Sequence, residues 1–155
     1  MILRSILGPA VDLTVTGYQF PGGEPSRDRE DSNWVNVSLE VASSVGSWTT
    51  AGAWLMTWEV EELVEWLGTV ARGEVPGPLG FVEPNLAFET RGLFGEEAHV
   101  RVLFELEARP HWVQRDRTSH DVWVDLLLPP AGLSAAADEL HVSVEQYPVR
   151  GASLR

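Results

Sequence analysis

The sequence predicts an α+β fold, a largely antiparallel β-sheet of about seven to eight strands packed by two α-helices. Several segments alternate apolar and polar residues, most regularly over residues 97–109, which is typical of half-buried strands. Two other segments, near residues 58–72 and 133–147, carry apolar residues at helical spacing. With 155 residues and no cysteine, the chain is expected to form a single domain (residues 1–155) without disulfides.

The N-terminal third is expected to be strands. Strands are predicted over residues 2–7, 11–20 and 33–42, followed by one that contains Gly46 and Trp48. Residues 21–32 between them are rich in Gly, Pro and charge, which indicates a loop. The strand with Trp48 is expected to run directly into the first helix.

The helix near residues 58–72 is the most clearly patterned element. Its apolar stripe is formed by Val60, Leu63, Val64, Leu67 and Val70. Thr57 is predicted to be its N-cap and Gly73 its left-handed stop. Four glutamates are expected in the first turn and on the solvated face: Glu59, Glu61, Glu62 and Glu65. There their negative charge interacts favourably with the positive end of the helix dipole and aids solubility.

The C-terminal half returns to strands and closes with a second helix. Short strands are expected over residues 81–91, and longer ones over 97–109 and 121–128, which we expect to pair antiparallel. Residues 133–147 fit a helical stripe capped by Ser134, but Leu140, Val142 and Val144 also fit a strand. The alanines at the start of this segment favour the helix.

The charge is strongly negative. Eleven basic and twenty-three acidic residues give a net charge of −12, which repels nucleic acid and anionic membranes and attracts a basic partner. The same charge could serve solubility alone. The N-terminal apolar run is too short for a signal peptide, and no segment has the roughly 20 apolar residues of a membrane span. We therefore expect a cytoplasmic protein that binds neither nucleic acid nor membrane.

Catalytic and metal-binding patterns are weak. His111, Asp116, His120 and Asp121 are residue types that bind metals, but they lack a recognised spacing and have arginines nearby, so no metal or cofactor is predicted. The helix glutamates lack the buried neighbourhood that a catalytic carboxylate needs. Neither a nucleophile elbow nor a phosphate-binding glycine loop is present in the sequence, so no catalytic residue is assigned.

The tryptophans allow two interpretations. Trp34 and Trp123 are predicted on the faces of their strands opposite the aliphatic residues, and Trp112 lies in a charged loop. These rings could belong to the core of a sheet covered on both faces. They could instead be exposed anchors for a protein partner, since tryptophan is frequent in interface hot spots.

Several short motifs, in order, resemble one family. They are Tyr18-Gln19-Phe20-Pro21, Asn33-Trp34-Val35-Asn36-Val37, the strand with Gly46 and Trp48, the helix from Thr57 to Leu67, Phe81-Val82-Glu83-Pro84-Asn85-Leu86, and Tyr147-Pro148. Together they are similar to the WapI-type immunity proteins, small bacterial proteins that neutralise contact-dependent or polymorphic toxins. The resemblance covers roughly residues 10–149 and does not include the 109–118 loop.

The resemblance implies that the protein is not an enzyme and that it binds a toxin domain, in the family's best-known case a tRNA-cleaving nuclease. A nuclease is expected to present a basic groove to phosphates, which an acidic protein can occupy. The residues expected to contact the toxin are Asp28, Glu30, Asp31, Trp34, Glu59, Glu62, Glu65 and Trp112.

Two other functions remain open from the sequence. One is an enzymatic or small-molecule-binding α+β domain with a tryptophan-rich pocket, which would need polar groups that converge in an apolar cavity. The other is a structural subunit, which would form stable homo-oligomers. The oligomeric state itself is left open.

Overall fold

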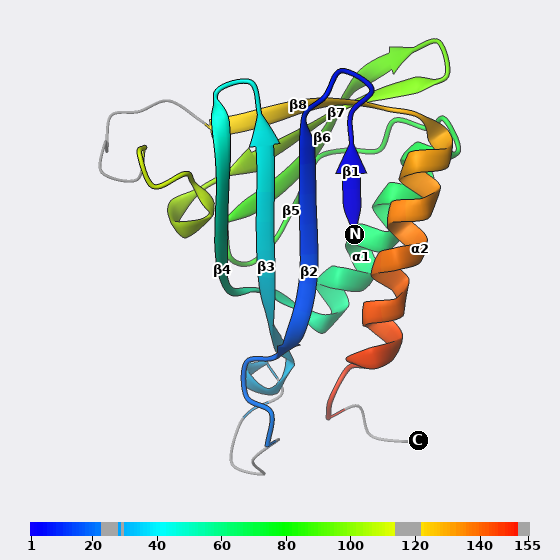
Figure 1. Cartoon of the computed structure of the whole chain (residues 1–155). Coiled ribbons are helices and arrows are strands. Elements are labelled where there is room, and N and C mark those ends of the chain that lie inside the picture. The colour runs from blue at the N-terminus through cyan, green and yellow to red at the C-terminus, as the bar shows by residue number, and fades with distance from the viewer. Residues whose placement is uncertain (23–27, 29, 114–121, 152–155) are drawn as a thin grey trace.

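The computed structural model describes residues 1–22, 28, 30–113 and 122–151, and it confirms the α+β class. Eight strands and two α-helices make up the described part (Figure 1). The strands are β1 (Ile2–Arg4), β2 (Ala10–Tyr18), β3 (Trp34–Ser43), β4 (Gly46–Met56), β5 (Leu79–Gly80), β6 (Leu86–Phe94), β7 (Glu97–Phe104) and β8 (Val122–Leu128). The helices are α1 (Thr57–Ala71) and α2 (Pro130–Gln146), and the short 3₁₀ turns are η1 (Asp31–Asn33) and η2 (Leu106–Ala108).

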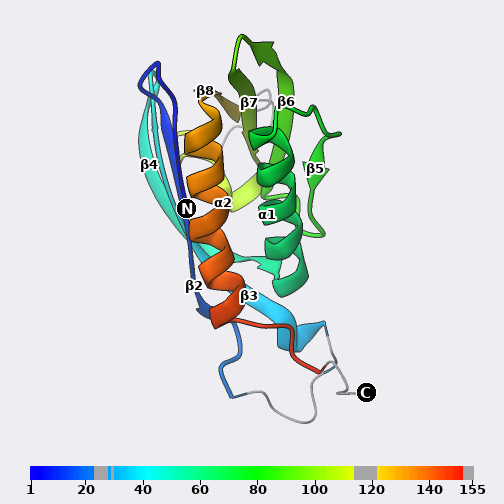
Figure 2. The same cartoon turned by 90° about the vertical axis from the view of Figure 1, so that its right-hand side faces the viewer.

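The strands form two antiparallel sheets, whereas the sequence predicted one. Sheet A has the order β1-β2-β3-β4 and sheet B the order β5-β6-β7-β8. Alternation of apolar and polar residues specifies the buried face of a strand, but not which strand lies beside it. The division arises because β4 runs without a loop into α1, which carries the chain away from sheet A before β5 begins. Figure 2 shows the two helices side by side, with one sheet on either side of them.

Two sets of hydrogen bonds join the sheets. The Leu127 N–H of β8 donates to Ser5 Oγ at 2.9 Å, and the Ile6 N–H donates to the Leu127 carbonyl at 3.0 Å. At the other join, the indole N–H of Trp48 donates to the Ala108 carbonyl at 3.0 Å. The apolar core therefore continues from sheet A to sheet B.

The first helix lies where the sequence predicted it. Four residues of the predicted stripe are fully buried, Val60, Leu63, Leu67 and Val70. Gly73, with φ of +79°, ends the helix in the left-handed conformation as predicted. The prediction of Thr57 as N-cap is wrong, because the helix begins at Thr57 and Met56 is the N-cap.

The C-terminal segment is a helix, as the alanines indicated. It begins at Pro130, whose missing N–H is no loss in a first turn, so Ser134 is inside the helix and is not its cap. The predicted antiparallel pair is also confirmed, since β7 and β8 pair from Ala98 with Leu128 to Phe104 with Val122. No helix among the described residues is long and apolar enough to cross a membrane.

The tryptophans are divided between core and surface. Trp48, Trp54 and Trp66 are buried. Trp34 is half-buried, while Trp112 and Trp123 are 46% and 43% exposed. The core interpretation is therefore wrong for Trp123, whose face of sheet B is open to solvent.

Candidate functional site

The structure places four of the predicted partner-binding residues near one end of the molecule. The segment that enters β3 carries Asp28, Glu30 and Asp31, all exposed. It lies beside the start of α1, because Trp34 pairs with Met56, the residue that precedes the helix. Glu62 and Glu65 are exposed farther along α1, and Glu65 borders a hollow between α1 and α2. We call the set Asp28, Glu30, Asp31, Trp34, Glu62 and Glu65 the acidic surface.

Trp112 lies elsewhere. Its ring centroid is 5.9 Å from that of Trp48, and its edge covers Gly46, where an added Cβ would be 2.9 Å from Cη2. Gly46 and Met56 are the two ends of β4, which separates them by roughly 30 Å at the usual rise of a strand. Trp112 is therefore not part of the acidic surface.

Glu59 is buried, and the prediction that it lies on the solvated face is wrong. Its side chain is 4% exposed. Oε2 accepts the Met56 N–H at 2.9 Å, and Oε1 accepts the Val82 N–H at 2.7 Å. Because Met56 is the N-cap, Glu59 stands at the third helical position, where a glutamate can reach back to the cap N–H. Glu59 thus connects α1 to the segment before β6, and we leave it out of the acidic surface.

Burial raises the pKa of Glu59, and the nearby charges of Glu62 and Glu83 add to the effect, while the two N–H bonds oppose it. The folded protein therefore holds this proton more tightly than the unfolded chain. Stability from this group is present at low pH and is lost as the pH rises above the ordinary glutamate value of 4.5.

We expect the free energy of unfolding of wild type minus that of Glu59→Gln to fall as the pH rises from about 4 to 7. Glutamine keeps the shape and accepts one of the two N–H bonds, but it does not titrate. Urea unfolding of both proteins across this pH range measures the difference. A difference that stays constant, or that grows with pH, would contradict the raised pKa.

Asn33 connects the acidic segment to α1 and to the C-terminal residues. It is fully buried, and its Oδ1 accepts the Thr57 hydroxyl at 2.9 Å and the Arg150 N–H at 2.8 Å. Its Nδ2 donates to the Arg150 carbonyl at 3.0 Å. One side chain thus joins three segments that are far apart in the sequence.

Arg150 extends this connection to the end of β2. Its guanidinium lies 3.3 Å from the ring centroid of Tyr18, and it donates to the Phe20 carbonyl at 2.8 Å and the Pro21 carbonyl at 3.1 Å. The Tyr18 hydroxyl in turn donates to the Pro148 carbonyl at 2.6 Å. We call Tyr18, Asn33, Thr57 and Arg150 the tie.

The sequence did not identify the tie as a unit. Four motifs that carry the family resemblance, at residues 18–21, 33–37, 57–67 and 147–148, nevertheless meet there. Their order along the chain was visible in the sequence, but their contact in space was not. The tie holds Asn33, whose N–H also donates to the Glu30 carbonyl at 2.9 Å.

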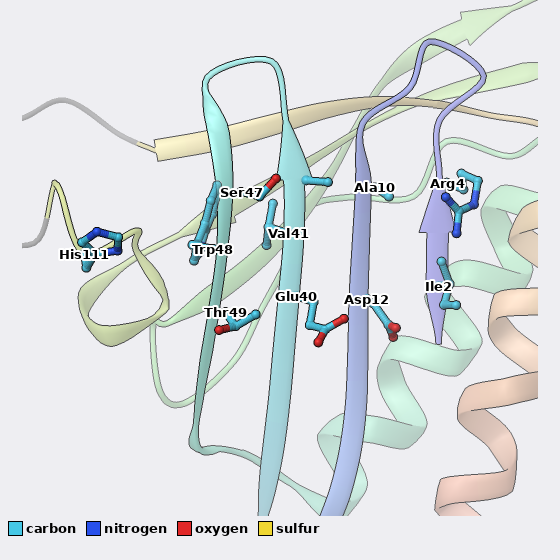
Figure 3. Close-up of a pocket in the computed structure, with 11 residues that line it drawn as sticks. Ile2, Arg4, Ala10, Asp12, Glu40, Val41, Ser47, Trp48, Thr49 and His111 are labelled. Carbon is cyan, nitrogen blue, oxygen red and sulfur yellow. The ribbon is translucent and has the colours of Figure 1, made fainter.

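A hollow of about 630 Å³ lies on the open face of sheet A, and it is not a tryptophan-rich pocket (Figure 3). Asp12 and Glu40 lie close together on it, Arg4 lies toward one end, and His111 comes from a separate loop at the side. Trp48 borders it, but Trp48 is buried and belongs to the core.

No group of three or more His, Asp or Glu side chains in the described part of the chain is placed to hold a metal ion. Of the cluster considered from the sequence, Asp116, His120 and Asp121 lie outside the described residues. His111 is exposed and packs edge-to-face on Trp112, with 5.0 Å between ring centroids.

The comparisons with known proteins identify a family. The model of the Immunity protein WapI-like family matches residues 2–148. This range runs from β1 through the end of α2 and includes most of the tie. No curated protein matches the chain. The match confirms the resemblance that the order of motifs indicated.

Proposed function

The chain belongs to the WapI-like immunity protein family, and we propose that it binds and neutralises the toxin domain of a bacterial polymorphic or contact-dependent toxin. The family match over residues 2–148 is the observation that carries this proposal. We further propose that the toxin domain is a nuclease and that the two proteins meet in the cytoplasm. An immunity protein acts by binding, so no catalytic residue is required of this chain.

We propose that the acidic surface is where the toxin binds. A nuclease needs a positively charged groove for phosphates, and a protein of net charge −12 is attracted to such a groove from a distance. Glu30, Asp31, Glu62 and Glu65 are exposed and free to face it. Trp34, half-buried beside them, supplies apolar area of the kind that dominates interface energetics.

The tie supports this assignment. A binding loop that is already ordered loses less conformational entropy when its partner binds. Side-chain hydrogen bonds of Asn33 and Arg150 to backbone groups hold Asn33 in place. Glu30 and Asp31 therefore lie close in sequence to a backbone position that these bonds fix.

The test is binding to the toxin-domain protein encoded next to this gene, with salt titration and two triple variants. The first, Glu30→Gln/Asp31→Asn/Glu62→Gln, neutralises the acidic surface. The control, Glu74→Gln/Glu96→Gln/Asp138→Asn, removes as much charge from exposed positions elsewhere. We expect the first to slow association on the order of tenfold at low salt and to weaken its salt dependence, and the control to do so much less.

The outcomes test the immunity function and the acidic surface separately. A tight one-to-one complex that inhibits the toxin establishes the immunity function. Equal losses in both triple variants would mean that only net charge matters and would reject the acidic surface as the contact site. No binding at low salt would reject the neighbouring protein as the partner and, with it, the proposed function.

A further inference from the structure

Strand β4 lies at the edge of sheet A. The strand order is β1-β2-β3-β4, so β4 pairs on one side only, as Figure 1 shows. Ser43 and Gly46 close a two-residue turn and therefore form a hydrogen-bonded pair, and such pairs alternate along the ladder between β3 and β4. The backbone N–H and C=O of Gly52 thus point toward β3, whereas those of Ala51 and Ala53 point away from it.

The second half of this edge is open. The first half is covered by η2, because the side chains of Trp48 and Thr50 donate to η2 carbonyls at 3.0 and 2.8 Å. Beyond that point, the outward N–H and C=O groups of Ala51 and Ala53 form no hydrogen bond within the described part of the chain. A bulge opposite Val35 ends the regular edge after Ala53. Four backbone groups are therefore left to meet a partner.

The other sheet edges carry protection that this stretch lacks. At β1, the Ile2 N–H donates to Glu139 Oε2 of α2 at 3.2 Å. At β8, the Leu127 N–H is bonded to Ser5 Oγ, and Asp125 places a charge on the strand. The remaining edge strand, β5, has only two residues. By contrast, β4 is long and contains neither proline nor charge, the devices that commonly keep an exposed edge from pairing.

A side-chain donor lies beside the open edge. Trp54 is 5% exposed, and its indole covers Gly52 so closely that an added Cβ there would clash with the indole nitrogen. The indole N–H donates to no acceptor in the described part of the chain, whereas those of Trp48 and Trp66 each donate to a carbonyl. It is not sealed from solvent either. Because a buried indole usually has an acceptor, this N–H is available to a carbonyl that a partner supplies.

We propose that the edge of β4 from Ala51 to Ala53 binds an extended strand of the toxin domain, which joins sheet A through main-chain hydrogen bonds. The unpaired groups belong to a backbone, so what they recognise is another extended backbone. The place suits the proposed toxin contact, because Met56, about 10 Å farther along β4, pairs with Trp34 of the acidic surface. A second copy is a poor occupant, since two chains of net charge −12 repel each other. This inference rests on the proposed function.

The first test is amide hydrogen exchange of the full chain, alone and in complex with the toxin-domain protein encoded next to its gene. In the free protein, the outward amides of Ala51 and Ala53 should exchange fast, and the Gly52 amide, which is bonded to β3, slowly. In the complex, we expect exchange at Ala51 and Ala53 to slow at least about tenfold. Gly52 is the internal control, and its exchange should slow less because its amide is already bonded.

The second test is a proline substitution at the open edge. Ala51→Pro removes one outward N–H and spares the ladder to β3, because proline is tolerated on an edge strand where its nitrogen faces outward. We expect it to weaken toxin binding on the order of tenfold. Ser47→Pro is the matched control, since Ser47 is also exposed and also faces outward on β4, but lies outside the proposed stretch. It should change toxin affinity less than about twofold.

The outcomes distinguish this inference from the proposed function. A tight, inhibitory complex in which Ala51 and Ala53 exchange as fast as in the free protein would overturn the inference alone, as would equal weakening by both prolines. A chain that does not bind the toxin at all would reject the proposed function and the inference with it. Protection of these amides that appears without toxin, as the protein concentration rises, would assign the edge to a second copy instead. Circular dichroism verifies that each variant is folded.

Discussion

Replacement of Trp48 by alanine is expected to lower the free energy of unfolding by about 3–5 kcal/mol, the usual cost of removing a large buried ring. The Trp48 side chain is 6% exposed, and its ring packs edge-to-face on Phe104, with centroids 5.2 Å apart. Its indole N–H also donates to the Ala108 carbonyl of η2. The substitution therefore removes contact between sheet A and sheet B as well as side-chain volume.

Two controls divide this effect into its parts. Trp48→Phe keeps an aromatic ring and loses the N–H bond to Ala108. Its cost in free energy of unfolding should be smaller than that of Trp48→Ala by about 2 kcal/mol. Trp123→Ala removes a ring that is 43% exposed, so it should cost clearly less than Trp48→Ala. Denaturant unfolding followed by far-ultraviolet circular dichroism gives each value without depending on tryptophan fluorescence. Equal losses for Trp48→Ala and Trp48→Phe would contradict a packing role for the ring.

The sequence predicted those features of the fold that depend on local periodicity. The stripe that includes Leu63 and Leu67 predicted α1, and the alternation around Val102 and Val124 predicted β7 and β8 with their antiparallel pairing. Such patterns are visible in a single segment because each element buries one face. The direct passage from β4 into α1 was predicted for the same reason.

The features that the sequence did not predict depend on contacts between distant segments. The division into two sheets follows from the path that α1 gives the chain, not from any strand alone. Asn33 and Arg150 are 117 residues apart, and neither has a pattern that points to the other. Trp34 and Trp123 occupy equivalent positions in the strand pattern, yet Trp34 is half-buried and Trp123 is 43% exposed.

The acidic residues show the same limit at the candidate site. From the sequence alone all of them are interpreted as surface charge, but Glu59 accepts backbone hydrogen bonds at the start of α1. Asp28 is also partly structural, because its Oδ1 accepts the Asp31 N–H at 2.8 Å. Within the acidic surface, Glu30, Asp31, Glu62 and Glu65 are exposed, and they are the carboxylates that we propose meet the partner. This distinction determines which substitutions test binding and which test folding.

Asn33→Ala is the substitution that relates folding to binding most directly, and we expect it to lower the free energy of unfolding by about 2–4 kcal/mol. It removes the acceptor of the buried Thr57 hydroxyl bond and both partners of the Arg150 backbone. It should also release the segment that carries Asp28, Glu30 and Asp31. Toxin affinity is then expected to fall on the order of tenfold, because binding must order that segment again.

Thr57→Val is the matched control, since it keeps the side-chain shape and removes only the hydroxyl bond to Asn33, at a cost of about 1 kcal/mol. A double-mutant cycle with Asn33→Ala isolates the energy of that one contact. Hydrogen exchange of the Arg150 amide and of the η1 amides reports whether the segment is released. An Asn33→Ala protein that is less stable but binds the toxin with unchanged affinity would show that the tie serves the fold alone. Faster exchange together with weaker toxin binding would instead show that the buried amide of Asn33 determines how firmly the acidic charges are held for their partner.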